Sequence, residues 1–143
     1  MNLRQAKTDD LPAVSALLEA QRLPLDGVAD SIRDYIIAEE KGAVAGTIGL
    51  ERYERYGLLR SAAVATGWQG KGVGQLLVER LLETAKACGL TDVYLFTTTA
   101  ERYFPRYGFK VIPREAVPEP VQRSVEFTSA CPSSATVMVR EIA

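Results

Sequence analysis

The chain has 143 residues, of which 47% are apolar and 24% charged; this is the size and composition of one globular domain, which we expect to span residues 1–143. A net charge of −1 excludes a general attraction to nucleic acids or anionic membranes, and no apolar run approaches the roughly 18 residues of a membrane-spanning helix. The sequence contains no histidine, so imidazole nucleophile activation, histidine bases and histidine-ligated zinc are excluded.

The N-terminal half predicts short strands and short helices. The capping oxygens of residues 8–10 and the proline Pro12 favour the start of a helix, in which Val14, Leu17 and Leu18 have helical spacing. We expect these elements in chain order: a strand at 2–6, a helix that begins near Pro12, a short helix at 30–34, and a β-hairpin with strands at 35–38 and 44–50.

The second half contains the longest expected helix, at residues 72–88. Val73, Leu77, Leu81 and Ala85 repeat every four residues, and Gly89 suits the left-handed conformation in which many helices end. The other expected elements are strands at 58–64, 92–99, 108–112 and 136–142, and a short helix at 100–107. The sequence therefore predicts a mixed α/β fold with strand–helix–strand units.

Residues 113–132 differ from the rest in composition, because they hold four of the seven prolines and few periodic apolar residues. Proline cannot donate a hydrogen bond to a strand ladder. We therefore expect either a long loop here or an edge excursion with a short strand.

The cysteines and the N-terminus indicate the compartment. Cys88 and Cys131 match no zinc-ligand spacing and form no CxxC motif, so we interpret both as reduced thiols and expect no metal site. Residues 1–10 contain no apolar run behind their basic residues. A secretory signal is therefore not expected, and a cytoplasmic location is.

Three glycines and a lysine lie at the start of the long helix, in the run Gln69-Gly70-Lys71-Gly72-Val73-Gly74. The first amides of a helix have no intrahelical acceptor and lie at the positive end of its dipole, and Lys71 adds a full charge, so the run suits a diphosphate. A plain glycine-rich turn explains the glycines equally well. The spacing excludes a Walker loop, and it matches a dinucleotide-binding fingerprint poorly.

At these residues the sequence resembles a known family. The strand Leu59–Val64 followed by Gln69, Gly72 and Gly74 is similar to the [RQ]xxGx[GA] cofactor motif of the GNAT superfamily of N-acetyltransferases, and Ala100–Phe109 resembles the later A-x-x-F-Y-x-x-x-G-F segment. Both motifs occur in the family's order with a strand between them. The resemblance implies the GNAT fold: a mostly antiparallel, twisted sheet of six to seven strands, splayed between the fourth and fifth strands and flanked by about four helices.

A narrower resemblance involves segments spread along the chain. Gly49–Glu51, Leu59–Ser61, Tyr94–Ala100, Glu126–Phe127 and Cys131–Ala135 are similar to the GNAT subgroup encoded with bacterial arsenic-resistance genes. That link is a genomic association, so it names no substrate.

The resemblance implies that acetyl-CoA is the co-substrate and lies where the strands at 58–64 and 93–99 splay apart. Backbone groups of Ala63 and Val64 would pair with the pantetheine arm, and one amide there would polarise the thioester carbonyl. The residues expected to bind the pyrophosphate are Gln69, Gly70, Lys71, Gly72, Val73, Gly74 and Gln75. A neutral amine would then attack the thioester directly, and the departing thiolate would gain a proton or leave as an anion.

The motifs do not by themselves assign the proton donor and the base. The position of the family's usual donor tyrosine holds Phe104, which has no proton to give. Tyr103 is the alternative donor, although an aromatic that packs its helix onto the sheet explains it too. Glu51 closes an apolar strand and is the candidate base or an anchor for a cationic substrate; a solvated carboxylate at a strand end is the competing interpretation.

The candidate substrate-binding residues are Arg60, Thr98, Glu126 and Cys131. Arg60 lies in an otherwise apolar strand, where an unpaired charge is costly, so we expect it to pair with a substrate carboxylate, Glu51 or Glu126. Strand alternation directs one or two hydroxyls of residues 97–99, including Thr98, toward the cleft. Cys131 is expected to line the pocket or to serve in packing.

Three functions remain open. The leading one is an acetyl-CoA-dependent N-acetyltransferase acting on a small-molecule amine, for example an amino acid or a toxic analogue. Phe104 favours the second, a non-catalytic acyl-CoA sensor. The third is a protein lysine or N-terminal acetyltransferase, which the near-neutral charge and a lid formed by residues 113–132 disfavour. No nucleic-acid or membrane partner is expected, and family precedent suggests a homodimer.

Overall fold

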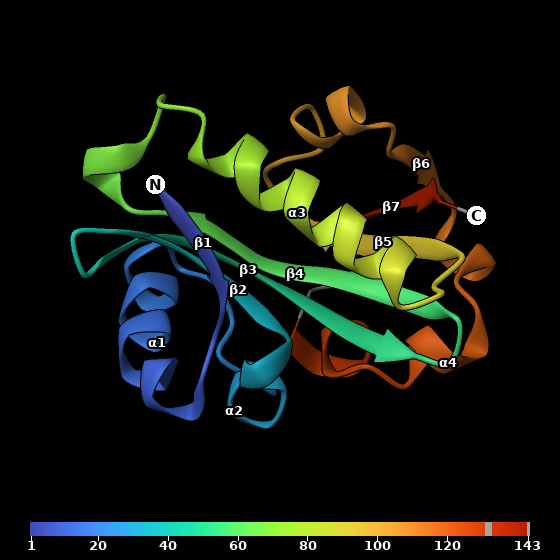
Figure 1. Cartoon of the computed structure of the whole chain (residues 1–143). Coiled ribbons are helices and arrows are strands. Elements are labelled where there is room, and N and C mark those ends of the chain that lie inside the picture. Colours follow the sequence, from blue (N-terminus) through green and yellow to red (C-terminus); the bar gives the residue numbers. More distant parts are fainter. Residues whose placement is uncertain (131–132, 143) are drawn as a thin grey trace.

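The structure is a computed structural model that describes residues 1–130 and 133–142 (Figure 1). Its strands are β1 (Asn2–Gln5), β2 (Tyr35–Glu40), β3 (Ala43–Tyr53), β4 (Tyr56–Val64), β5 (Asp92–Thr97), β6 (Lys110–Ile112) and β7 (Thr136–Glu141). Its α-helices are α1 (Leu11–Ala20), α2 (Val28–Ser31), α3 (Val73–Ala87) and α4 (Glu119–Gln122). In the part of the chain described, none of the helices is both long enough and apolar enough to cross a bilayer.

All seven strands form one sheet in the order β1-β2-β3-β4-β5-β7-β6. Every neighbouring pair is antiparallel except β4 and β5, which run parallel. The predicted mixed α/β fold, with a mostly antiparallel sheet of six to seven strands and about four helices, is therefore confirmed.

Strand alternation distributes the helices over the two faces of the sheet. On β2, Ile36 points into the core cluster that contains Leu77 of α3, whereas its neighbour Ile37 points into the cluster that contains Leu18 of α1. Accordingly, α3 lies across one face while α1 and α2 cover the other (Figure 1). The helical periodicity seen in the sequence thus buries the apolar stripe of α3 against the sheet.

The end of β5 differs from its prediction. The strand stops at Thr97 instead of residue 99, because the Thr97 hydroxyl oxygen accepts hydrogen bonds from the amides of Thr99 (3.3 Å) and Ala100 (2.9 Å) and turns the chain. The helix predicted at 100–107 is reduced to the 3₁₀ helix η4 (Phe104–Tyr107), with Pro105 in its first turn.

Residues 113–132 form neither a plain loop nor a strand in their described part. They contain the 3₁₀ helix η5 (Arg114–Ala116), α4 and the π-helix η6 (Glu126–Ala130). Pro113 and Pro118 stand directly before two of these turns, and their carbonyls accept the amides of Ala116 and Val121. The expectation of a short strand was wrong, because these prolines precede helical turns as N-caps instead of breaking an edge strand.

The parallel pair β4–β5 is incomplete. Its paired residues end at Leu58 and Tyr94, although β4 continues to Val64 and β5 to Thr97. On its other edge, β5 remains paired with β7 as far as Thr97. The second half of β4 therefore has a free edge that faces a gap in the sheet.

Candidate functional site

The gap between β4 and β5 opens into a cavity of about 640 Å³. One end, which we call the α3 end, is lined by Gly70, Gly72, Gly74 and Gln75. The other, which we call the Arg60 end, is lined by Arg22, Leu23, Pro24, Arg60, Ser61 and Glu126. The free edge of β4 connects the two ends, so a long molecule can contact both.

A β-bulge in β4 accounts for the gap. Thr47 of β3 is opposite Ala63 and Gly49 is opposite Arg60, so the single residue between them on β3 faces two residues of β4. Ser61, in this bulge, has a left-handed backbone with φ of 58°. A bulge bends its strand and increases the local twist, which turns the end of β4 away from β5.

The backbone of Val64 faces the free edge. The Ala65 amide donates to the Ala45 carbonyl at 2.8 Å, so by alternation the backbone of Ala63 is directed toward β3 and that of Val64 toward the gap. The Val64 carbonyl accepts the side-chain amides of Gln21 (2.8 Å) and Gln69 (3.1 Å). Of the two strand residues expected to pair with a pantetheine arm, both line the cavity, and Val64 presents its backbone to it.

The α3 end consists of backbone amides at a helix start. Gly72, with φ of 83°, is the N-cap of α3, and no described side chain caps the helix there. The first-turn amides of Val73, Gly74 and Gln75 therefore lack intrahelical acceptors and lie at the positive end of the dipole. Six of the seven predicted loop residues line the cavity; the exception is Lys71, whose ammonium lies 5.3 Å from the centre of the Trp68 ring.

Tyr103 lies beside the start of α3. Its hydroxyl is so close to Gly74 that a Cβ at that position would be 2.7 Å away, which explains the glycine. The same hydroxyl is 2.7 Å from the Tyr107 hydroxyl. Burial, together with this hydrogen bond, raises the pKa of Tyr107, so Tyr107 stays protonated at neutral pH.

Phe104, by contrast, belongs to the core. It is 5% exposed and packs edge to face against Tyr103 and Phe109. The absent hydroxyl at this position therefore leaves no buried polar group unsatisfied. Tyr103, not Phe104, brings a phenol to the cavity.

Arg60 is enclosed at the other end of the cavity, and its side chain is only 1% exposed. It donates to a Glu51 carboxylate oxygen at 3.1 Å, to the Ser61 hydroxyl at 3.2 Å, and to the backbone carbonyls of Pro24 and Asp26. These bonds tie the chain after α1 to β3 and β4. Of the partners predicted for Arg60, the structure provides two carboxylates, because Glu126 lies 3.8 Å from it in addition to Glu51.

The two carboxylates differ in their access to the cavity. Glu51 is 5% exposed, does not line the cavity, and accepts a hydrogen bond of 2.6 Å from the Tyr53 hydroxyl on its far side. Burial and this bond raise the pKa of Tyr53. Glu126 does line the cavity. Of the two carboxylates, Glu126 is therefore the one on the cavity wall, and Glu51 lies behind Arg60.

The remaining predicted residues have different outcomes. Thr98 is exposed just beyond the end of β5 and lines the cavity. Cys131 lies outside the described residues. Arg22 and Ser61 also line the cavity, although the local sequence pattern predicts neither. The packing of the chain after α1 brings Arg22 there, and the β-bulge in β4 accounts for Ser61.

Comparison with known proteins identifies the family. A family model for the acetyltransferase (GNAT) domain matches residues 31–111. An uncharacterized N-acetyltransferase of Chlorobaculum tepidum is 29% identical over 129 residues, which cover 85% of this chain and 83% of that protein. An amino-acid acetyltransferase of Mycobacterium tuberculosis is 30% identical over 120 residues, which cover 77% of this chain and 68% of the relative.

Solved structures show the same fold. The crystal structure of Rv2747 from Mycobacterium tuberculosis, in complex with CoA, matches the whole chain over its own whole length with a TM-score of 0.85 and 24% identity. N-acetylglutamate synthase from Neisseria gonorrhoeae, complexed with coenzyme A and N-acetyl-glutamate, matches with a TM-score of 0.85 and 22% identity; the match covers 99% of this chain and 35% of the synthase. With its splayed strands and its family match, the chain belongs to the GNAT acetyltransferase family.

Proposed function

We propose that the protein transfers the acetyl group of acetyl-CoA to the amine of a small molecule. The observation that carries this proposal is the free edge of β4, which begins after Leu58 and runs to the uncapped start of α3 within one cavity. An extended pantetheine arm can add to that edge at Val64 as an extra strand would, and the first-turn amides of α3 suit a pyrophosphate.

The chemistry needs three proton steps around one bond exchange: two losses from nitrogen and one gain by sulfur. The ammonium of the acceptor loses a proton, its nitrogen lone pair forms the C–N bond at the thioester carbonyl, the C–S bond breaks, and the nitrogen loses its second proton. The CoA thiolate carries away the electron pair and gains a proton. Glu126 is placed to accept from the acceptor, and the Tyr103 hydroxyl, supported by Tyr107, is the candidate donor to sulfur.

The walls of the Arg60 end favour a small-molecule acceptor over a protein. Pro24 from the chain after α1 and Glu126 from η6 both form cavity wall there, and Arg60 connects them. Two of the relatives support this choice by name, the amino-acid acetyltransferase of Mycobacterium tuberculosis and the Neisseria synthase solved with N-acetyl-glutamate. A cytoplasmic location belongs to the same proposal, and the arsenic-resistance association stays a prediction.

Release of thiol from acetyl-CoA, measured over a panel of small amines, tests the proposal. We expect the rate to rise above the hydrolytic background with one class of amine. The position of Phe104 favours one competing function, a sensor that binds acyl-CoA without turnover. Calorimetry could show that CoA binds while thiol release stays at the background rate with every amine. That result would establish the sensor and reject the enzyme.

A further inference from the structure

A hydrogen-bond network at the bulge of β4 fixes the direction of one hydroxyl in the cavity. Ser61 is 9% exposed and forms part of the cavity wall. Its Oγ lies 2.8 Å from the hydroxyl of Tyr35 and 3.2 Å from Nε of Arg60. An arginine has no lone pair to offer, so in the second of these bonds Arg60 donates and Ser61 accepts.

Burial decides the polarity of the bond between the two hydroxyls. Tyr35 is 0% exposed, and among the described residues its hydroxyl has Ser61 as its only hydrogen-bond partner. Burial raises the pKa of Tyr35 to about 12, so the phenol keeps its proton at neutral pH. If Ser61 donated, the phenol proton would be buried without an acceptor, which is costly. Tyr35 is therefore the donor and Ser61 the acceptor.

The proton of Ser61 consequently has one direction left. A serine oxygen carries two lone pairs and one proton, and here Tyr35 and Arg60 occupy both lone pairs. In the described part of the chain nothing accepts the remaining proton, so the O–H is available to a ligand in the cavity. Two donors on the same oxygen also polarise its O–H bond, which makes it a stronger donor.

The packing of Tyr35 keeps this arrangement rigid. Tyr35 on β2 lies opposite Gly49 on β3, and a Cβ at position 49 would be 2.5 Å from the tyrosine ring. The absence of a side chain at Gly49 thus lets the ring pack against the β3 backbone. Because a close-packed core leaves such a ring little room to move, its hydroxyl stays directed at Ser61.

The position of Ser61 along β4 matches the thioester end of acetyl-CoA. This step rests on the proposed function, in which the pyrophosphate lies at the start of α3 and the pantetheine arm runs back along the free edge from Val64. Ser61 precedes Val64 by three residues, about 10 Å along a strand. The reactive end of the arm therefore approaches the bulge, on the side away from α3.

We infer that the Ser61 hydroxyl is a catalytic hydrogen-bond donor to the carbonyl oxygen of the thioester. As the acceptor nitrogen bonds to the carbonyl carbon, the π electrons of C=O move to the oxygen, and the Ser61 O–H stabilises that negative charge while keeping its proton. The double bond re-forms as the C–S bond breaks. Sulfur is a weaker hydrogen-bond acceptor, and an ammonium has no lone pair to accept the bond.

Infrared spectroscopy of bound acetyl-CoA, isotopically labelled at its carbonyl carbon, tests the contact without any acceptor amine. A hydrogen bond weakens the C=O bond and lowers its stretching frequency. We expect the band in Ser61→Ala to lie at a higher frequency than in the wild type, because the donor is gone. Tyr35→Phe keeps the Ser61 hydroxyl but frees its orientation, so its band should lie between the other two.

The choice of variants separates the contact from a general loss of stability. Ser61→Ala and Tyr35→Phe each remove one buried hydroxyl from the same network, but only Ser61→Ala removes the donor. Thr84→Ala removes an exposed hydroxyl of α3, which bonds to the Arg80 carbonyl outside the cavity, and should leave the band unchanged. If circular dichroism shows that Ser61→Ala does not fold, Ser61→Cys replaces it; its thiol is a weaker donor, so the band should move in the same direction.

Kinetics with an amine that supports turnover give a second readout. Ser61→Ala should lower kcat about a hundredfold and leave KM for acetyl-CoA nearly unchanged, because the bond strengthens only as the oxygen becomes negative. Tyr35→Phe should lower kcat by less. An unchanged kcat in folded Ser61→Ala, or a loss confined to KM, would overturn the catalytic role.

The outcomes distinguish this inference from the proposed function. A carbonyl band at the same frequency in wild type and Ser61→Ala, with acetyl-CoA bound to both, would overturn the role of Ser61 and leave the proposed transferase intact. A band shift that Ser61→Ala abolishes, in a protein that acetylates no amine, supports the contact although the transferase is rejected. Failure of acetyl-CoA to bind at all rejects both.

Discussion

Arg60 and Arg22 carry the same charge at the same cavity, but their surroundings give them different roles. Burial by itself lowers the pKa of Arg60, and the neighbouring Tyr35 together with the negative charges of Glu126 and Glu51 outweighs that effect and raises it, so Arg60 stays charged and bound to the protein. Arg22 is exposed and has no described partner. Arg60 therefore shapes the site from inside the protein, whereas Arg22 lies exposed on the cavity wall.

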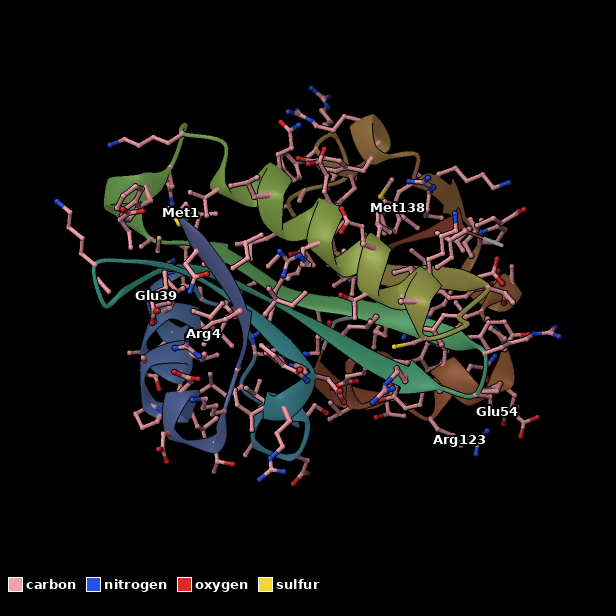
Figure 2. All side chains as sticks on the ribbon, viewed as in Figure 1. Met1, Arg4, Glu39, Glu54, Arg123 and Met138 are labelled. Carbon is pink, nitrogen blue, oxygen red and sulfur yellow. The ribbon has the colours of Figure 1, made fainter. Side chains whose placement is uncertain are left out.

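Replacing Arg60 tests its structural role. Arg60→Met leaves Glu51 and Glu126 without their cation, so we expect the free energy of unfolding to fall by about 3–5 kcal/mol. Arg123→Met is the matched control, because Arg123 pairs with Glu54 at 3.0 Å on the surface, with 63% and 67% of the two side chains exposed (Figure 2). Exposed pairs contribute at most about 1 kcal/mol. Urea unfolding measures the change in unfolding free energy for each variant. Equal decreases in Arg60→Met and Arg123→Met would contradict a stronger contribution from the buried pair.

Gly74 and Tyr103 form a second residue-scale test. In Gly74→Ala the new Cβ would lie 2.7 Å from the Tyr103 hydroxyl, so we expect a loss of about 1–3 kcal/mol from overpacking. With Tyr103→Phe in the background the clash is gone, and alanine, a better helix former by about 1 kcal/mol, should become neutral or stabilising. Urea unfolding of the wild type, the two single variants and the double variant gives the coupling free energy between the two positions. Additive effects of the two changes would refute the contact.

At the scale of elements, the site is a product of one bulge and one helix start. The bulge at Ser61 turns the end of β4 away from β5, and α3 begins where that free edge arrives. The β-hairpin before it needs only local chemistry: Lys41 and Gly42, both with positive φ, form its two-residue turn. Neither the bulge nor the gap depends on the turn, so the hairpin supports the site without forming it.

Amide hydrogen exchange should report ligand binding at the free edge. We expect coenzyme A to slow exchange at Val64 and at the first-turn amides of α3, Val73 to Gln75, because these amides have no acceptor among the residues that the structure describes. Leu58, already paired with Tyr94 in the sheet, should change little and serves as the internal control. Protection that appears only elsewhere would show that coenzyme A does not bind along this edge.

The junction of β1, η1 (Thr8–Asp10) and β2 predicts an acid-sensitive contribution to stability. Nη1 and Nη2 of Arg4 donate to Asp10, at 2.8 and 2.9 Å, and Arg4 also pairs with Glu39 at 3.1 Å. Arg4 and Glu39 are labelled in Figure 2. Chiefly through the Arg4 hydrogen bonds, the pKa of Asp10 falls from 3.8 to about 2. The contribution is therefore complete above about pH 4 and is lost as the pH falls through 2.

Asp10→Asn tests this linkage. The difference in unfolding free energy between wild type and variant should be constant from pH 6 to about pH 4 and should shrink toward pH 2. Asp9→Asn, an exposed neighbour outside the Arg4 bonds, provides the comparison. A difference that stays constant down to pH 2 would exclude a lowered pKa for Asp10.

At the scale of the whole molecule, one sheet contains both the first and the last strand of the chain. The last strand, β7, is inserted between β5 and β6, and β5 in turn pairs with β4. Removal of β7 would therefore separate β6 from the sheet. Large apolar side chains of the described residues that remain exposed, namely Met1, Leu25, Leu76 and Val111, come from separate parts of the chain. The homodimer suggested by family precedent stays a prediction, which light scattering can check.

Unfolding should be one cooperative transition, because β7 ties the C-terminal strands into the sheet that α1 and α3 cover. Fluorescence of Trp68, near the cavity, and far-ultraviolet circular dichroism of the whole chain should give the same midpoint in urea. Two separate midpoints would contradict a domain that spans residues 1–143 as a single folding unit.

Local chemistry in the sequence determined most elements and the α3 end of the site. The helix at Val73–Ala87 follows from apolar spacing and terminal glycines, and the availability of its first amides follows from helix geometry alone. The prolines of residues 113–132 could not be interpreted in this way, because proline is compatible with a loop and with the start of a helical turn. Helical turns form here because they bury Val117 and Val121 in the core.

Only the tertiary structure decided the Arg60 end. Alternation along β4 cannot be counted through a bulge, because the extra residue at Ser61 changes which side chains face the cavity. Packing placed Arg60 between the carboxylates and left Glu126, instead of Glu51, on the cavity wall. Arg22 reaches that wall through contacts between segments far apart in the chain, and such contacts leave no periodic trace in the sequence.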